Sequence, residues 1–403
     1  MSTKEPTSPK SMKERIAELR ENRERLEQGG GPERQARQRE QGKMTARERL
    51  DTLLDEGTFE EMGLFARHRQ TRFGLADREI PADGVVTGAG AIDRRLVHVA
   101  SQDFTAMGGS AGEVHANKIA DAMEQSLHTG SPFVFINDSG GARLQEGIDS
   151  LSGYGRIFFT NTELSGAVPQ ISIICGPCAG GAAYSPALTD FVIQTRQSQM
   201  FITGPGVIKE VTGEEVTPQE LGGPEAHMVY SGVNHFIAEN DEEALYLCKR
   251  LLSFLPSNNL EDPPRLPFGD EVGPDPELND VVPADPKKSY DVREVIRRVV
   301  DAGDLLEVQE GHAQNLVVGF ARLVGRAVGV IANQPSVLSG VLDTVASVKA
   351  ARFIRFCNAF NFPLITFVDV PGFLPGVGQE RSGSIRHGAK RLYDYSSATV
   401  PKL

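Results

Sequence analysis

Short apolar runs alternate with stretches of helical periodicity along most of the chain. Apolar runs bounded by glycine, proline or asparagine indicate buried strands, whereas apolar residues three and four positions apart indicate helices. From about Gly84 the two patterns follow each other repeatedly, which is typical of α/β folds. The strands expected from this pattern are 96–100, 133–137, 171–174 and 201–202, and the expected helices are 11–28, 46–54, 113–128, 150–165, 241–255 and 291–302.

Changes in this pattern divide the chain into four parts. Residues 1–60 are highly charged and predict a helical arm, to which we assign no chemistry. Residues 61–258 and 291–403 each predict a unit of alternating strands and helices. The segment 259–290 between them is rich in proline, aspartate and asparagine, and it predicts a linker.

An internal repeat relates the two strand–helix units. A shift of 231 residues without gaps aligns 88–141 with 319–372 and gives 11 identities in 54 positions. Both copies read strand, glycine turn, helix with a lysine, proline, apolar strand, aspartate and glycine, so the repeat predicts two domains of one fold. The second copy reaches residue 403 soon after its aspartate, and we therefore expect the second domain to be incomplete.

Composition narrows the class of protein. A formal net charge of −12 over 403 residues argues against a nucleic-acid-binding protein, which needs a basic face. No apolar run approaches the roughly 20 residues of a membrane span, and the N-terminus lacks the apolar core of a signal peptide. Four cysteines are too few for a disulfide framework. We expect a cytoplasmic protein that binds neither nucleic acid nor membrane.

Two glycine-rich turns follow apolar strands and precede helices. One reads Asp-Ser-Gly-Gly-Ala-Arg over 138–143, and the other reads Gly-Pro-Cys-Ala-Gly-Gly-Ala over 176–182. Such turns direct backbone N–H groups at one point, with the positive end of a helix behind them. N–H groups from two neighbouring turns make an oxyanion hole, and glycine lets a ligand oxygen come close. The alternative is that both turns are only helix caps packed on a sheet.

Other motifs carry weaker hypotheses. Residues 108–112 fit the pattern around a nucleophilic serine, here Ser110, but a poor strand precedes them. Cys175 and Cys178 have the spacing of a redox motif, and a metal site would need further ligands. No phosphate-binding loop is present. Three isolated histidines could act as bases but are more often structural, namely His227, His235 and His387.

Eight longer runs, spread over nearly the whole chain, carry a specific resemblance. They are GKMTARERL (42–50), DSGGARLQEG (138–147), GPCAGGAAYSPAL (176–188), FITGP (201–205), ELGG (220–223), KAARF (349–353), DVPGFLPG (369–376) and IRHGAK (385–390). Together they resemble the β, or carboxyltransferase, subunit of biotin-dependent acyl-CoA carboxylases of the propionyl-CoA and acetyl-CoA type.

The resemblance implies two crotonase-like (ClpP/crotonase) domains in tandem, the second incomplete. It implies transfer of a carboxyl group from carboxybiotin to the α-carbon of a short-chain acyl-CoA through a thioester enolate, without a metal. Biotin would be attached to a carrier rather than to this chain. The first domain would bind acyl-CoA, and the second domain of a neighbouring subunit would present carboxybiotin. The expected partners are a biotin carboxylase and biotin carboxyl carrier (alpha) subunit, and further copies of the chain in a homohexamer.

Site residues follow from the resemblance by position. The candidates for the acyl-CoA oxyanion hole are Gly141, Ala142, Gly180 and Gly181, and one wall of the biotin-side hole matches Gly372 and Phe373. Gly108, Gly109 and Ser110 are expected along the CoA path, and Lys118 and Arg143 are candidates to contact CoA phosphates. The alternative role for this last pair is ordinary ion pairing.

Some features depart from the family pattern. Ala111 stands where leucine is usual, Gly206 where aspartate is usual, and Cys175 where an apolar residue is common. The strand and glycine turn expected to complete the biotin-side hole do not follow residue 403, so we expect a C-terminally truncated chain that is inactive or poorly soluble alone. Two other functions stay open: the alpha subunit of a biotin-dependent acyl-CoA decarboxylase, and an inactive truncated structural subunit. The preferred acyl-CoA is also left open.

Overall fold

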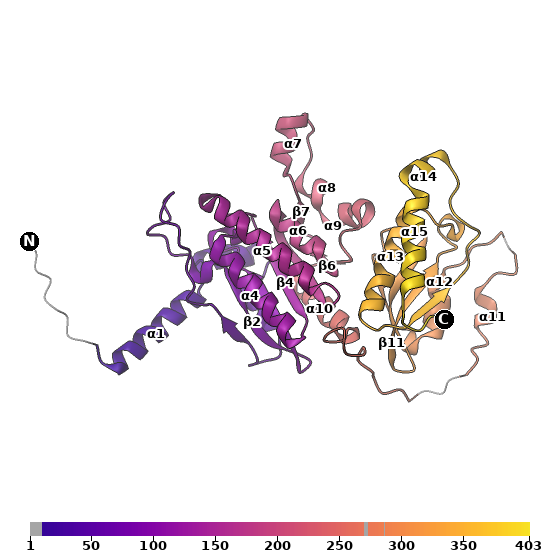
Figure 1. Ribbon diagram of the computed structural model, residues 1–403, viewed down its shortest axis with the longest axis horizontal. Helices are drawn as coiled ribbons and strands as arrows, with labels where there is room; N and C mark the ends of the chain where they lie inside the picture. Colours follow the sequence, from indigo (N-terminus) through magenta and orange to yellow (C-terminus); the bar gives the residue numbers. More distant parts are fainter. Residues whose placement is uncertain (1–9, 270–272, 286) are drawn as a thin grey trace, which may run out of the picture.

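The computed structural model describes residues 10–269, 273–285 and 287–403 (Figure 1). Residues 1–9 of the predicted arm, and 270–272 and 286 of the predicted linker, lie outside the described residues. Within the described part, the arm contains α1 (Met12–Glu27), α2 (Pro32–Glu40) and α3 (Ala46–Leu53). α1 is exposed along almost all of its length, whereas α3 packs against the first sheet and α10.

Eight strands form the first sheet, which is antiparallel at one edge and parallel elsewhere. β1, β2 and β3 pair antiparallel, and parallel pairing continues through β4, β5, β6 and β8, with β7 beside the end of β5. Every residue of β4 is buried, as expected for a parallel strand covered on both faces. The strands are β1 (Glu60–Met62), β2 (Val85–Ile92), β3 (Arg95–Gln102), β4 (Phe133–Ser139), β5 (Gln170–Ala179), β6 (Phe191–Thr195), β7 (Gln199–Phe201) and β8 (Phe236–Ala238).

Helices cover both faces of this sheet. Alternate residues of β4 belong to two hydrophobic clusters: Phe133 and Phe135 face α4 and α5, while Val134 and Ile136 face α3 and α10. Because successive side chains of a strand point to opposite faces of the sheet, β4 contributes to both hydrophobic cores. The longest of these helices are α4 (Glu113–Thr129), α5 (Ile148–Leu164) and α10 (Asp241–Phe254). The shorter α6 (Gly181–Leu188) follows β5, and α7 (Pro205–Thr212), α8 (Pro218–Gly222) and α9 (Pro224–Ala226) lie between β7 and β8.

The second half contains a four-stranded sheet. In Figure 1, α10 lies between this half and the first sheet. Its strand order is β12-β11-β10-β9, antiparallel except for the parallel β11–β12 pair. Its elements are α11 (Leu278–Val281), α12 (Val292–Val299), β9 (Leu305–Val308), β10 (Leu316–Leu323), β11 (Arg326–Asn333), α13 (Thr344–Ala359), β12 (Leu364–Phe367), α14 (Val377–Ser382) and α15 (Ser384–Ser397).

The 231-residue repeat is a structural repeat. β2, β3, α4 and β4 correspond in order and pairing to β10, β11, α13 and β12. An isolated parallel bridge recurs as well, between Ala111 and Ala142 and between Leu342 and Phe373. After α15, the amide of Leu364 donates to the carbonyl of Pro401, so the last residues lie beside β12 as β5 lies beside β4. The chain is therefore a tandem of two related α/β units.

The two halves share a hydrophobic core at their junction. Phe191 of the first half packs edge-on against Phe356, with ring centroids 4.7 Å apart, and against Phe320 at 5.8 Å. One hydrophobic cluster contains residues of both sheets. Aromatic rings bury large areas and add orientation-dependent attraction, so this contact fixes the two units relative to each other.

The sequence pattern predicted α1, α3, α4, α5, α10 and α12 and the central strands β3, β4 and β5, but it gave no ranges for the long helices α13 and α15. β1, β2, β6 and β8 were not predicted, and the strand expected at 201–202 is the end of β7. β2 carries two glycines because its surface is tightly covered: a Cβ on Gly88 would lie 2.2 Å from the carbonyl oxygen of Glu60. Within the described residues, no helix is both long and apolar enough to cross a membrane.

Candidate active site

The two predicted glycine turns lie side by side at one edge of the first sheet. β4 and β5 run parallel with Ser139 opposite Cys178, so the turns that follow leave the sheet together. Gly141 has a φ of 99°, and a Cβ there would lie 2.8 Å from the carbonyl oxygen of Ala179. The first turn therefore approaches the end of β5 closely enough to require glycine.

Backbone hydrogen bonds leave the amide of Ala142 unpaired. The amide of Ala111 donates to the carbonyl of Gly141 (2.9 Å), and the amide of Arg143 donates to the carbonyl of Ala111 (2.9 Å). The Ala142 N–H between them points away from this bridge, and it has no acceptor among the residues that the structure describes. The amide of Gly141 is already bound to the hydroxyl of Ser139 at 3.0 Å.

Gly181 supplies the second amide that has no acceptor in the described part of the chain. It is the first residue of α6, and first-turn N–H groups have no acceptor within their own helix. Gly180, with a φ of 61°, donates its own N–H to the carbonyl of Phe201 at 3.0 Å. Of the four residues predicted here, Ala142 and Gly181 can donate to a ligand, whereas Gly141 and Gly180 shape the turns.

The predicted CoA-path residues contact the first turn. The amide of Gly140 donates to the carbonyl of Gly108 at 3.0 Å, and a Cβ on Gly109 would lie 2.2 Å from the carbonyl oxygen of Asp138. The hydroxyl of Ser110 donates to the carbonyl of Met107 at 2.9 Å. These contacts support a structural role for the segment and give Ser110 a partner other than a catalytic base.

Lys118 lies in the interior, which corrects the expectation that it contacts CoA phosphates. Its Nζ donates to the carbonyl oxygens of Ala82 (2.7 Å) and Val85 (2.5 Å), and burial lowers its pKa to about 8. Lys349, its counterpart in the second half, likewise donates to the carbonyl of Leu316 at 2.7 Å. The recurring lysine therefore satisfies backbone carbonyls at the start of equivalent strands.

Arg143 requires the same correction. Its side chain is 1% exposed and forms ion pairs with Asp83 (2.6 Å) and Glu146 (2.8 Å). It also donates to the carbonyl of Ser110 at 2.8 Å. The ion-pairing alternative holds for Arg143, because a buried guanidinium with these partners cannot reach a phosphate at the surface.

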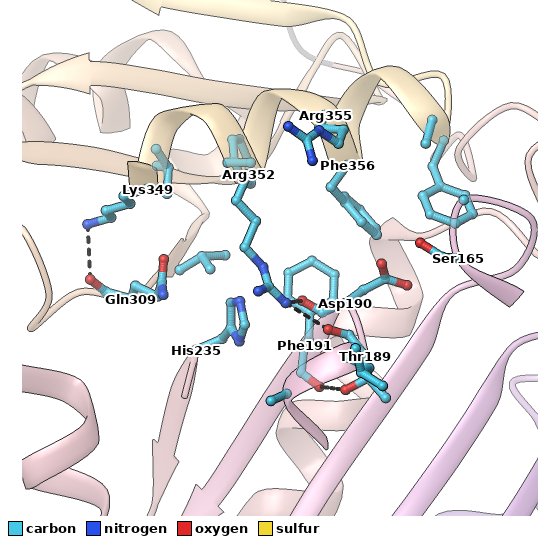
Figure 2. A pocket seen from close by; sticks show the side chains of 18 residues that line it. Ser165, Thr189, Asp190, Phe191, His235, Gln309, Lys349, Arg352, Arg355 and Phe356 are labelled. Carbon is cyan, nitrogen blue, oxygen red and sulfur yellow. Dashed lines mark hydrogen bonds between the residues drawn. The ribbon is translucent and has the colours of Figure 1, made fainter. Parts of the chain in front are cut away.

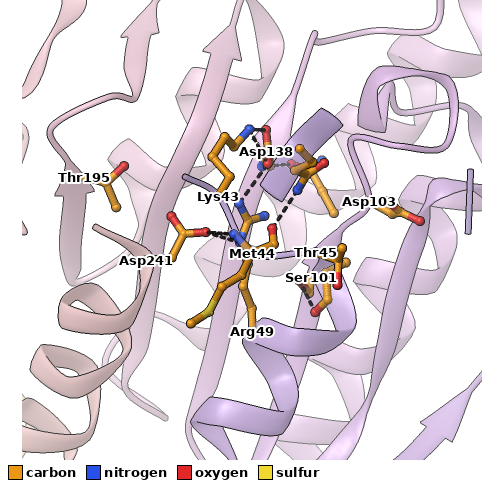
Figure 3. Close-up of polar contacts among 12 residues, drawn as sticks. Lys43, Met44, Thr45, Arg49, Ser101, Asp103, Asp138, Thr195 and Asp241 are labelled. Atoms are coloured by element: carbon orange, nitrogen blue, oxygen red, sulfur yellow. Dashed lines mark hydrogen bonds and ion pairs between the residues drawn. The ribbon is translucent and has the colours of Figure 1, made fainter. Parts of the chain in front are cut away.

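A buried charged cluster lies beneath the first turn (Figure 3). The carboxylate of Asp138 pairs with Lys43 at 2.7 Å and Arg49 at 2.9 Å, and Arg49 also pairs with Asp241 at 2.8 Å. The Asp138 and Arg49 side chains are completely buried. The sequence analysis missed this cluster, since its members come from the arm, β4 and α10 and meet only in the fold.

The second half repeats the unpaired amide. The amide of Leu342 donates to the carbonyl of Gly372 (3.0 Å) and that of Leu374 donates to the carbonyl of Leu342 (2.7 Å), so the Phe373 N–H between them stands where that of Ala142 stands. Gly372 has a φ of 148°, and no atom would lie within 4 Å of a Cβ there. Phe373 is 49% exposed, and its amide has no acceptor among the residues that the structure describes.

The thiols and histidines do not form a reactive group here. Burial raises the pKa of Cys175, and it raises that of Cys178 to about 12, so both thiols stay protonated and buried. His227 contacts the carbonyl of Met200 at 2.6 Å, and His387 packs beside Gly383. Among the described residues, no three His, Cys, Asp or Glu side chains are grouped to hold a metal ion.

Comparison with known proteins identifies the family. The carboxyl transferase domain family matches residues 37–403. The chain belongs to this family. It is 61% identical over 393 residues to the methylmalonyl-CoA carboxyltransferase 12S subunit of Propionibacterium freudenreichii subsp. shermanii, covering 98% of this chain and 75% of that protein. It is 56% identical over 395 residues to the propionyl-CoA carboxylase carboxyltransferase subunit of Haloferax mediterranei, covering 98% and 77%.

A solved structure confirms the fold of this carboxyltransferase. The crystal structure of transcarboxylase 12S, a hexamer assembly with methylmalonyl-CoA and methylmalonic acid bound, matches with a TM-score of 0.96 at 61% identity. The match covers 98% of this chain and 78% of that one. The predicted crotonase-like carboxyltransferase fold is therefore confirmed, and the chain is an enzyme of the carboxyltransferase class.

We predict that replacing Arg49 by methionine destabilises the enzyme by about 3–5 kcal/mol, because Asp138 and Asp241 would keep buried charges without their shared partner. Thermal and urea unfolding measure the change. Arg47→Met is the matched control: it removes a cation from the same helix, paired with Glu61 at 2.8 Å, but it does not touch Asp138. Equal losses in the two variants would contradict a special role for the cluster.

We also predict that His115 makes the stability sensitive to acid. Its Nδ1–H donates to the carbonyl of Asp83 (2.8 Å) and its Nε2 accepts from Gln102 (3.2 Å), so the ring is held neutral, and burial lowers its pKa to about 3. Below about pH 6.5 this histidine is protonated in the unfolded chain but stays neutral in the folded chain. The free energy of unfolding therefore falls by about 1.4 kcal/mol per pH unit, down to about pH 3.

The histidine variants separate this effect from the other acid-sensitive groups. The difference in unfolding midpoint between wild type and His115→Gln should shrink between pH 7 and pH 5, since only wild type carries this proton-linked loss. The exposed His128 at the end of α4 provides the control His128→Gln. A constant difference for His115→Gln over this pH range would refute the prediction.

Proposed function

We propose that the enzyme transfers a carboxyl group between carboxybiotin on a carrier protein and the α-carbon of a short-chain acyl-CoA, with propionyl-CoA and methylmalonyl-CoA as the substrate pair. The observation that carries this proposal is the pair of unpaired amides, Ala142 and Gly181, at adjacent ends of parallel strands. The names of the relatives, which include methylmalonyl-CoA carboxyltransferase and propionyl-CoA carboxylase, support this substrate class.

In this proposal the first half binds the acyl-CoA. The thioester oxygen accepts from the amides of Ala142 and Gly181, and negative charge grows on that oxygen as the α-proton leaves. This proton would pass to the ureido nitrogen of biotin, which has released its carboxyl group as CO2, and the α-carbon would then bond to the CO2. Fixed donors bind an enolate oxygen more tightly than a neutral carbonyl, so they lower the barrier rather than only retain the substrate. The positive end of α6 acts in the same direction. The segment 108–110 lies along the path of the CoA portion.

The biotin side is assigned to the second half. The site is open around Gly372 and Phe373, and the Phe373 amide offers one donor beside a half-exposed aromatic ring. A planar, neutral ureido ring fits these features, because its oxygen can accept from the amide while its carbon skeleton lies on the ring. Carboxybiotin would supply the carboxyl group when bound. Gly372 and Phe373 would orient the ureido oxygen toward the second half.

We propose that each active site combines the first half of one chain with the second half of a neighbouring chain. Large apolar side chains are exposed on the helical segments that follow the glycine turns, as expected for surfaces that another subunit covers. The related 12S subunit forms a hexamer, which supports a homo-oligomer here. A biotin carboxylase and carrier subunit remain the proposed partners. The exposed apolar residues are Leu144, Ile148, Leu151 and Tyr184 in the first half and Val377, Ile385, Leu392 and Tyr393 in the second.

A proline at position 181 tests the proposed donor. Gly181 occupies the first position of α6, where proline is tolerated, so Gly181→Pro removes one N–H with little change to the helix. We expect kcat for carboxyl transfer from methylmalonyl-CoA to a biotin carrier to fall by about 100- to 1000-fold, the usual cost of one oxyanion-hole donor. KM should change little, because the donor acts mainly in the transition state.

Gly181→Ala is the matched control, since it adds a Cβ but keeps the N–H. That Cβ would lie 3.4 Å from the Tyr154 ring, an ordinary contact. The alanine variant should retain most of the wild-type kcat. Equal kcat values for the proline and alanine variants would contradict the role of this amide. No transfer by the wild type to the biotin carrier, when it is assembled with its proposed biotin carboxylase and carrier subunit, would contradict the proposed function itself.

Mixed oligomers test the placement of the site between subunits. Gly181→Pro disables the first half and Phe373→Pro removes the unpaired amide of the second half. When the two inactive variants are unfolded and refolded together, about one quarter of the sites should combine two intact halves, and activity should return. Activity is measured before and after mixing. A hybrid as inactive as its parents would place both halves of each site in one chain.

A further inference from the structure

A cavity of about 420 Å³ lies between the two halves, away from both glycine turns (Figure 2). Its wall includes Thr189, Asp190 and Phe191, at the beginning of β6, and Arg352 and Phe356 on α13. The glycine turns follow the ends of the parallel strands β4 and β5, whereas this cavity opens beside the start of β6. It therefore lies at the opposite edge of the sheet from the unpaired amides of the first half.

His235 directs an unpartnered donor into this cavity. The residue is 4% exposed, and its Nδ1 accepts the amide N–H of Val192 at 3.1 Å. Burial holds the pKa of the ring well below its usual value, so the ring is neutral and its single proton is on Nε2. Its edge-on contact with Phe191 fixes the ring plane, and the Nε2–H has no acceptor among the described residues.

Arg352 lies beside His235 and keeps part of its guanidinium available (Figure 2). Its Nη2 donates to the carbonyl oxygens of Thr189 (2.7 Å) and Asp190 (3.5 Å). Its Nε–H and Nη1–H groups have no acceptor within the described residues, and it forms no ion pair with the carboxylate of Asp190 there. The backbone contacts hold the planar guanidinium in place, and its remaining three N–H donors, one on Nε and two on Nη1, are left for a ligand in the cavity.

Asp190 contributes an acceptor on the same wall. One carboxylate oxygen accepts the amide of Gln170 at 2.9 Å, and the other has no partner among the residues described. Burial raises the pKa of Asp190 to about 7. Lys349 also lines the cavity, but three backbone carbonyls already accept from its Nζ. On this wall Arg352 and His235 thus offer donors that suit a carboxylate, and Asp190 offers an acceptor that suits a hydroxyl.

We propose that this cavity binds a small hydroxycarboxylic acid. Arg352 and His235 bind the carboxylate, Asp190 accepts from the hydroxyl, and Phe191 and Phe356 pack against the carbon skeleton. The volume is within the range of small-molecule sites. This site is separate from the proposed carboxyl-transfer site.

Calorimetric titration of the assembled 403-residue chain with 3-phenyllactate tests the proposal, with the neutral amide of 3-phenyllactate as the control ligand. We expect saturable binding of the acid and at least about tenfold weaker binding of the amide, because charge-assisted bonds to the guanidinium are lost. Arg352→Gln should weaken binding of the acid by about tenfold or more, and Arg352→Lys by less, since lysine keeps the charge but not the fork.

Arg298→Gln is the matched charge control, because it removes an arginine of the same half that pairs with Asp275 and Glu277 instead of lining the cavity. It should bind the acid as wild type does, and Arg352→Gln should keep the wild-type rate of carboxyl transfer. Absence of saturable binding, equal affinity for acid and amide, or equal affinity of wild type and Arg352→Gln would each overturn the proposal. The comparison of the acid with its amide uses the wild-type protein, so it tests the proposed carboxylate binding even if Arg352→Gln folds poorly.

Discussion

The position of the first glycine turn depends on the carboxylate of Asp138, which two cations from the N-terminal arm hold in the interior. Asp138 lies four residues before Ala142, and Lys43 and Arg49 reach it from outside the sheet. A Cβ on Gly176 would lie 2.0 Å from the Asp138 carboxylate, so β5 also packs directly on this group. Buried ion pairs contribute little net stability, but loss of one partner strongly destabilises the protein because the other charge is left buried and unpaired. The cluster therefore acts mainly by restricting the end of β4 to a single position.

The two halves show which parts of this arrangement are general. Both keep the bridge that leaves one amide unpaired, at Ala142 and at Phe373, and both keep a buried lysine that satisfies strand carbonyls. They differ around the aspartate. Asp138 is buried in the charged cluster, whereas its counterpart Asp369 is exposed and accepts from the hydroxyl of Tyr290 at 2.8 Å. The fold thus keeps one backbone N–H donor in the same position in both halves. The side chains around that donor differ between the halves, so each half can bind a different ligand.

Sequence reasoning located the turns but could not assign roles within them. Glycine spacing indicated where backbone approaches a ligand, yet which amide is unpaired depends on the bridge between Ala111 and Ala142, which is tertiary. Lys118 looked like a phosphate ligand because burial of its side chain cannot be read from its place in a helix. The partners in the charged cluster are separated by 89 to 192 residues, so no local pattern connects Arg49 with Asp138 and Asp241. Short-range signals predict elements and turns, whereas charge pairing requires the fold.

The helix directions explain why the two edges of the first sheet differ in chemistry. At the edge with the glycine turns, α6 begins at Gly181, and its positive end adds to the unpaired amides. At the opposite edge, α6 ends at Leu188 and α13 ends at Ala359, and both residues line the junction cavity. Helix C-termini carry partial negative charge, so an anion can be held there only by side-chain cations. Arg352 lies at this edge. Its Nη2 donates to the carbonyl of Thr189, and its Nε–H and Nη1–H groups have no acceptor among the described residues. A backbone site and a side-chain site on one sheet thus follow from a single constraint, the parallel direction of its strands and helices.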